Sequence, residues 1–451
     1  MGPAARPRRP GGAALAVGIL ALGALPKAEA ATVLSGDAVT LNLGGDAKSF
    51  SFATFPYDSP LLPADPTGQG IFDLRLKAEA SALGWLRIEA HHQLTAVTSS
   101  DPASLGLGAS FSGAGGSAPQ AVDLSWAADA SPTGGFTLAG RVDRLAVGVS
   151  IPHVDLKLGR QPISFGQGYF FGPMDLVSPF SPTAVDREYK PGVDALRADA
   201  YLGTSTALTA VAAWLGPAPL TEGDASLADL GLVLTGTTTL GLWDVGLFLA
   251  SIREDRVVGI HGVGAVGPVS LRAEGTLTLP PEGEGDAPGE DPFARGLVGA
   301  DLYLAGPGVS FSAELYYQSL GADTSLGYLP FYLSDRYRRG ELWTAGHAYA
   351  AGSCAWEVTP LVTASLFTVA NLGDPSALLG PGLSWSVAEG ATLEAGGYVG
   401  VGARPDDLDP STLVDEAGIP LSPEALAGVV DLGSELGIVP ATAFVALKAY
   451  F

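Results

Sequence analysis

Apolar and polar side chains alternate at every second position in one segment of this chain after another. The segment IFDLRLKAEA (71–80) places apolar groups on one face and four charged groups on the other, Asp73, Arg75, Lys77 and Glu79. VSLRAEGTLTL (269–279) and VSFSAELYYQ (309–318) repeat the pattern. A two-residue period is that of a β-strand. Many such strands in one chain are typical of a membrane barrel, in which every strand turns apolar groups to lipid and polar groups to the lumen.

The spacing of these segments predicts an all-β fold, a transmembrane antiparallel β-barrel of about 18 strands, with 16 as the alternative count. Tight turns such as LGTS (202–205) and VGPV (266–269) alternate, with two short exceptions, with much longer connections. Short turns at one end and long loops at the other are typical of bacterial outer-membrane barrels. An even strand number places both termini at the same end.

The start of the chain has the three parts of a secretory signal peptide. Arg6, Arg8 and Arg9 precede an apolar run over 11–25, and small residues follow at 28–30. The run is shorter than the roughly 20 residues that a spanning helix needs. We therefore expect a signal peptide over 1–30 and one barrel domain over 31–451.

Charge and composition limit the partners. The whole chain has 24 basic and 47 acidic side chains and a net charge of −23, so nucleic acid is not an expected partner. With no apolar run long enough to span as a helix, membrane contact must come from strands. The expected location is the bacterial outer membrane. The expected partners are outer-membrane lipids, the barrel insertion machinery and small hydrophilic solutes.

The chain ends in a strand-like segment, ATAFVALKAYF (441–451). Phe451, Leu447 and Val445 fall on one face, which we expect to meet lipid, while Lys448 and Tyr450 fall on the other. We expect this strand to close the barrel against the first one. Such an ending resembles the signal by which outer-membrane proteins are presented to their insertion machinery. In this chain an alanine stands where that signal often has a second aromatic residue.

One internal stretch, residues 154–197, concentrates charges among prolines and glycines. Pro and Gly together favour a stiff, sharply bent loop over 161–192. This loop has two possible locations. Folded into the barrel, it would set the pore width and the charge selectivity; outside the barrel, its charges would pair with one another. The candidate pore or constriction residues are Arg160, Asp175, Asp186, Arg187, Glu188, Lys190 and Arg197.

The same stretch contains GRQ (159–161) followed by FGQG (165–168) and a proline-rich loop. These elements resemble the alginate-export type of outer-membrane barrel and related porin-like proteins. The resemblance covers about a tenth of the chain. It implies a passive or export channel of about 18 strands whose long segments fold over or into the pore.

We interpret the chain as a porin-like channel for passive diffusion of small hydrophilic solutes. The alternatives are an exopolysaccharide (alginate-type) export porin and a membrane-embedded hydrolase. Few basic side chains are available for a polyuronate, and the five histidines lie in no catalytic or metal-binding motif, so we expect no enzyme, cofactor or metal. The acidic loops predict weak cation selectivity, which Asp186→Ala should lower and Arg187→Ala should raise.

Overall fold

The computed structural model describes residues 31–36, 39–59, 62, 65–100, 120–129, 135–179, 186, 188–216, 226, 229–281, 291–405 and 430–451. Within these ranges the fold is almost entirely β. The signal peptide expected over 1–30 lies outside the described residues. No helix among the described residues is long and apolar enough to cross a membrane.

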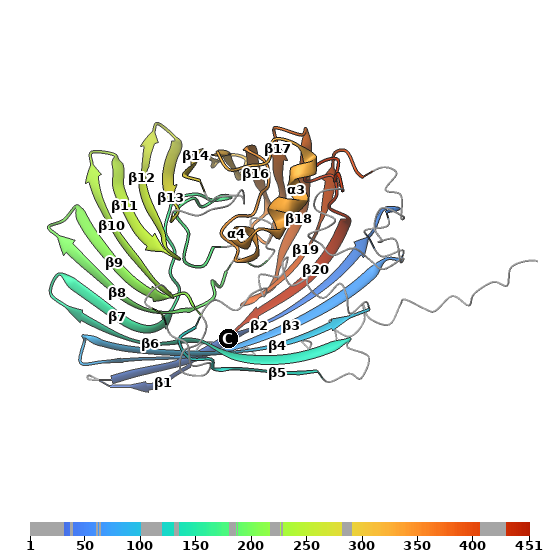
Figure 1. Cartoon of the computed structure of the whole chain (residues 1–451). Helices are drawn as coiled ribbons and strands as arrows, with labels where there is room; N and C mark the ends of the chain where they lie inside the picture. The colour runs from blue at the N-terminus through green and yellow to red at the C-terminus, as the bar shows by residue number, and fades with distance from the viewer. Residues whose placement is uncertain are drawn as a thin grey trace, which may run out of the picture.

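Eighteen antiparallel strands form a closed barrel, which confirms the predicted class and the higher of the two strand counts. Each strand pairs with the next along the chain, and β20 returns to pair with β2, with Asp46 opposite Tyr450 and Phe55 opposite Ala441. In Figure 1 the red β20 lies beside the blue β2. The first nine wall strands are β2 Val39–Phe55, β3 Thr67–Ala82, β4 Leu86–Ser99, β6 Phe136–Ile151, β7 Val154–Gln161, β8 Val193–Leu202, β9 Thr206–Trp214, β10 Leu230–Leu240 and β11 Trp243–Ile252. The other nine are β12 Asp255–Val266, β13 Val269–Leu279, β14 Phe293–Leu304, β15 Val309–Gln318, β16 Ala348–Thr359, β17 Val362–Asn371, β18 Ser376–Ala388, β19 Ala391–Val401 and β20 Ala441–Tyr450.

Two further short strands lengthen the wall where a neighbour ends. β1, Ala31–Ser35, pairs with Thr40–Leu43 of β2, on the edge of β2 that β20 occupies further along. β5, Ser125–Asp129, pairs with β6 beyond the end of the shorter β7. Neither strand was predicted from the sequence. Each pairs with an edge that is free only because the neighbouring wall strand is shorter, and strand neighbours are not visible in the sequence.

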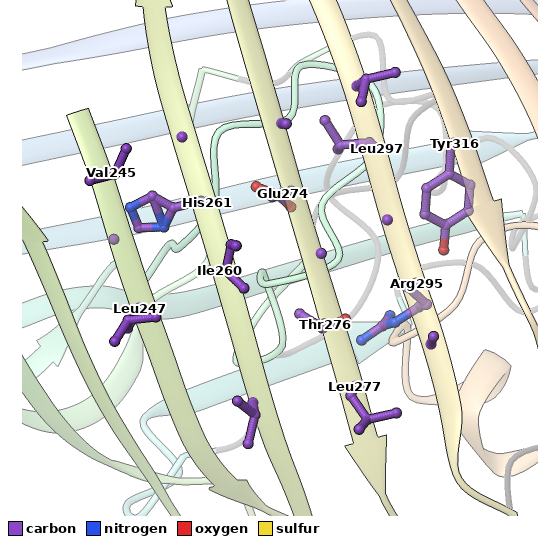
Figure 2. Close-up of a pocket in the computed structure, with 18 of the residues that line it drawn as sticks. Val245, Leu247, Ile260, His261, Glu274, Thr276, Leu277, Arg295, Leu297 and Tyr316 are labelled. Carbon is purple, nitrogen blue, oxygen red and sulfur yellow. The ribbon is translucent and has the colours of Figure 1, made fainter. Parts of the chain in front are cut away.

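The two faces of the wall follow the predicted alternation. On β13, Arg272 and Glu274 are buried toward the interior, while Leu277 is exposed on the outside. In the close-up of β11 to β14, Leu247, Ile260 and Leu277 lie on one side of the sheet and Glu274 on the other (Figure 2). An apolar hollow runs over this wall, where outward-facing glycines carry no side chain.

The ends of the barrel differ. The first described strand, β1, and the last residues of β20 both lie at the end with the short turns, because β1 pairs with the first residues of β2 and Tyr450 pairs with Asp46. Exposed tryptophans gather near the same end, at Trp85, Trp243, Trp356 and Trp385. Aromatic rings of this kind suit a membrane–water interface.

The long connection between β15 and β16 contains three helical elements: the 3-10 turn η4 Ser325–Gly327, and the helices α3 Tyr328–Leu333 and α4 Asp335–Arg338. Strand β16 begins at Ala348, because 341–347 packs against these helices as part of the loop. Strand β7 ends at Gln161, before Pro162. A proline lacks the N–H that a central strand needs.

Candidate channel interior

The connection between β7 and β8 is described over 162–179, 186 and 188–192, and these parts of it lie inside the barrel (Figure 1). Its first half contacts inward-facing side chains of β13 and β15, and its second half contacts inward-facing side chains of β2 and β20. We call this segment the interior loop. It therefore touches opposite parts of the wall.

The GRQ residues anchor the start of the interior loop. Arg160 is 2% exposed, and its guanidinium donates to both carboxylate oxygens of Asp194, at 2.9 Å each, and to the carbonyls of Val142 and Val122. Gln161 is equally buried and donates to the carbonyl of Ala195 at 3.0 Å. Arg160 thus holds β6, β7 and β8 together, and its donors are used by the protein itself.

A β-bulge in β6 brings two charged side chains to the interior at consecutive positions. His91 pairs with Arg144 and His92 with Val142, which leaves Asp143 as the extra residue. Asp143 and Arg144 are both buried, and they pair at 2.9 Å. Such bulges re-aim side chains locally. Asp143 also receives Arg75 from β3, so one carboxylate binds two guanidinium groups.

The first half of the interior loop is bound through its backbone. Glu314 on β15 accepts from the amide N–H groups of Tyr169, Phe170 (2.9 Å) and Phe171 (3.1 Å). Glu274 on β13 accepts from the amides of Gln167 at 2.5 Å and Met174 at 3.3 Å. We call these contacts the amide anchor. Because amides supply the donors, the anchor depends on the loop's shape more than on its side chains.

Aromatic packing supports the amide anchor. Phe171 stacks on Tyr316 with ring centroids 4.5 Å apart, and Phe170 stacks on Phe367 at 5.9 Å. Met174 is fully buried in a separate cluster against β8 to β12. The loop and the wall therefore share an apolar core. Burial of each large side chain stabilises the folded protein by about 1.5–3 kcal/mol, so this core contributes several kcal/mol.

The second half of the interior loop is bound through charged side chains. Lys48 of β2 donates to Asp186 at 2.7 Å and to Glu188 at 2.8 Å, and Lys448 of β20 donates to Glu188 at 3.0 Å. Tyr450 also donates to Glu188, at 2.7 Å. We call these contacts the lysine anchor. Lys48 and Lys448 are directly opposite each other across the pair of strands that closes the barrel.

The lysine anchor needs the loop's acids. Like charges directly opposite on adjacent strands destabilise a sheet, and the two carboxylates offset that repulsion. Burial opposes the charged form of Glu188, but hydrogen bonds and charges from Lys48, Lys448 and Tyr450 outweigh it and lower the pKa of Glu188 to about 2. The carboxylate is therefore ionised throughout the ordinary pH range.

Lys190 and Asp175 join the two halves of the interior loop. The Lys190 ammonium donates to both oxygens of Asp175, at 2.5 and 2.6 Å, and to Ser164 at 3.0 Å. Burial lowers the pKa of Lys190, although the charge of Asp175 acts in the opposite direction. The pair closes the loop on itself.

Two other long loops fold over the mouth. Arg336 of α4 donates to both oxygens of Asp255 at the start of β12 and to Glu341 in its own loop. Near β20, Glu435 accepts from the amide of Ala345 at 2.7 Å and from Asn371 at 2.6 Å. These contacts fix the β15–β16 loop and the last loop to the barrel rim.

The structure thus brings together Asp186 and Glu188 at one wall, and Asp175 and Lys190 within the loop. Arg160 lies apart at the end of β7, and Arg197 pairs with Asp199 of its own strand at 2.7 Å. Arg187 lies outside the described residues. Glu274 and Glu314 lie on the polar faces of the alternating segments 269–279 and 309–318, but their binding of loop amides was not foreseen. Lys48 and Lys448 were missed as loop contacts, although Lys448 was expected to face away from lipid.

The terminal strand has its predicted faces. Val445 is 38% exposed on the outside, Leu447 is half-buried on the same side, and Lys448 points inward. The backbone of Phe451 exchanges two hydrogen bonds with Gly45, at 2.9 and 2.6 Å. The ring of Phe451 lies so close to Gly45 that a Cβ there would stand 2.8 Å from it, so a side chain at this position would displace the ring.

The histidines form no catalytic arrangement with serine. His91 contacts Tyr189, His261 contacts Thr237, and His347 contacts Asp323. In the described ranges, no group of three or more His, Cys, Asp or Glu residues could hold a metal ion.

Solved outer-membrane proteins share the fold at low sequence identity. Acinetobacter baumannii OccAB2 matches with a TM-score of 0.54 and 10% identity over 91% of this chain and 98% of its own. The outer membrane protein opdK from Pseudomonas aeruginosa matches at 0.52 and 10%, and a BenF-like porin from Pseudomonas fluorescens Pf-5 at 0.51 and 11%, each with the same coverage. At such identities the likeness establishes the porin-type barrel fold.

No curated protein matches the sequence. No protein-family model matches it either, so the resemblance to alginate-export barrels gains no support as a family assignment.

Proposed function

We propose that the protein is an outer-membrane channel through which small hydrophilic solutes diffuse, and that the interior loop forms its constriction. The observation that carries this proposal is the interior loop itself, which is bound to opposite walls of a closed barrel. Because the loop is held at two separate parts of the wall, the open passage between the loop and the rest of the wall keeps a fixed width. The neighbours named as porins support the same function by analogy of fold.

The accessible charges favour cations. Inward-facing acids are the more exposed ones, with Glu79 at 59%, Asp301 at 42% and Glu188 at 40%. Among the inward-facing cations, Lys48, Arg75 and Lys448 are at most 5% exposed and paired. Solutes in the lumen would therefore meet mostly negative potential, which favours weak cation selectivity.

Current recordings in planar bilayers test both the channel function and the cation selectivity. The purified protein should give stable conductance steps, and a tenfold salt gradient should give a reversal potential of cation sign. The reversal potential should become smaller at high salt, because the Debye length falls to about 3 Å at 1 M and the charges of the lumen are then screened. A protein that inserts with native heat-modifiable mobility yet conducts no ions would overturn the channel function. Anion selectivity would overturn the charge argument alone.

A further inference from the structure

A cavity of about 140 Å³ lies between the interior loop and the β15–β16 loop. Its walls come from 164–179 of the first loop, 341–344 of the second, and the inward side chains Arg295 and Tyr316. One water needs roughly 10–15 Å³ of such space. The cavity is therefore large enough for a small organic solute.

Two buried hydrogen-bond donors on this cavity have no acceptor in the protein. They are Nε of Arg295 and the indole Nε1 of Trp343. Arg295 is 4% exposed; its two terminal nitrogens donate to the carbonyls of Pro173 and Glu341, whereas its Nε has no acceptor. Buried donors in folded proteins are almost always satisfied. Two unsatisfied ones on one cavity indicate a ligand with acceptor oxygens.

The other charges on the cavity decide the class of ligand. Asp175 and Glu341 also line it, each already bound to cations of its own loop. A carboxylate or phosphate would face both of these acids and only one guanidinium, and like-charge contacts are costly. A hydroxyl group accepts from Arg295 or Trp343 and can also donate to the spare lone pairs of a carboxylate.

Aromatic groups complete the lining. Tyr169 is 52% exposed and, like Trp343, lines the cavity, so ring faces are available beside the polar groups. Apolar surface with a few placed polar groups is the usual make-up of a small-molecule site. The geometry points to a binding subsite for an uncharged polyhydroxylated solute, a polyol or monosaccharide, at the outer side of the interior loop. This inference rests on the proposed channel function and names a class of solute for it.

Trp343→Phe tests the subsite with little structural change, because it removes one N–H and keeps an aromatic ring. D-glucose should reduce the ion current of the wild type in planar bilayers in a saturable way. The half-blocking concentration should rise about fivefold in Trp343→Phe, as expected for one hydrogen bond. Trp385→Phe, on the exposed outer face, is the matched control and should behave like the wild type.

Binding is also measured without conduction, by calorimetric titration of glucose into the protein in a detergent that has no sugar headgroup. Saturable binding that weakens in Trp343→Phe but not in Trp385→Phe supports the subsite, even if no current is seen and the channel function fails. Equal behaviour of the two variants, or no glucose binding to correctly folded protein, overturns it. Sodium acetate that competes at the same site with higher affinity than glucose would overturn the polyol class.

Discussion

The two ends of the interior loop are held by opposite chemistry. At the amide anchor the wall supplies carboxylates, Glu274 and Glu314, and the loop supplies backbone N–H groups. At the lysine anchor the wall supplies ammonium groups and the loop supplies Asp186 and Glu188. The first set of contacts is buried among aromatic rings, whereas Glu188 is 40% exposed.

This difference separates what positions the loop from what adjusts it. Backbone donors cannot be removed by substituting a loop side chain, so the amide anchor depends on the two wall carboxylates that accept from them. Exposed ion pairs are weaker and are screened by salt. The lysine anchor should therefore respond more strongly than the amide anchor to ionic strength and to single substitutions in the loop.

Glu314→Gln should have the largest effect. It weakens acceptors for three amides and removes the buried partner of Arg272, which donates to Glu314 at 2.8 Å. We expect a loss of about 3 kcal/mol in the free energy of unfolding and a raised single-channel conductance as the loop shifts. Urea unfolding in vesicles and bilayer recordings measure these.

Asp301→Asn is the matched control, since Asp301 also pairs with Arg272 but is not among the acceptors of the loop amides. Its partly exposed pair should contribute less than about 1 kcal/mol. If both variants have the same conductance and stability, Glu314 does not act through the loop.

The double change Asp186→Asn with Glu188→Gln should come next. It leaves Lys48 without its loop acids opposite Lys448, which keeps only Glu394 at 3.1 Å, and this should cost about 1 kcal/mol. Adding Lys448→Gln should recover most of that loss, because it removes one of the two like charges. Heat-modifiable mobility on gels follows the barrel's stability in all three proteins. A triple variant no more stable than the double one would refute the role of lysine repulsion.

Acid should release the lysine anchor over a defined range. Because the folded protein lowers the pKa of Glu188 from 4.5 to about 2, this contact contributes stability that is complete above pH 4.5 and is lost as pH falls toward 2. As this contact is lost, conductance should change below pH 4.5. In Glu188→Gln this acid-dependent change should be reduced, and an unaltered pH profile would contradict the assignment.

Glu79→Gln should have the smallest effect. Glu79 is inward-facing and 59% exposed near the short turns, away from both anchors. Its removal should lower the cation-to-anion permeability ratio by less than about twofold at 0.1 M salt, with conductance steps otherwise unchanged. At 1 M salt the variant and the wild type should agree, and a difference that persists there would point to a structural change.

The sequence predicted the barrel better than its interior. Alternation in each strand reports which side chains face lipid, so Asp73, Arg75, Glu274 and Glu314 were correctly placed inward from parity alone. The partners of these side chains come from segments up to 145 residues away, as in the contact of Tyr169 with Glu314, and no local pattern encodes them.

Backbone contacts were harder still to foresee. An amide N–H leaves no trace in residue identity, so the amide anchor could not be read from FGQGYFF. The lysine anchor did leave a signal, since the loop's acids and the inward Lys448 were each noted. Only the register between β2 and β20 sets Lys48 and Lys448 side by side.

The lysine anchor also bears on how the barrel assembles. Glu188 is 140 residues from Lys48 and 260 residues from Lys448, so three distant parts of the chain meet at one point. Contacts of such long range carry the highest loop-closure entropy and form late in folding. Joining the last strand to the first is thus more favourable, by about 1 kcal/mol, once the middle of the chain has delivered its acids, so closure of the seam and filling of the interior favour each other.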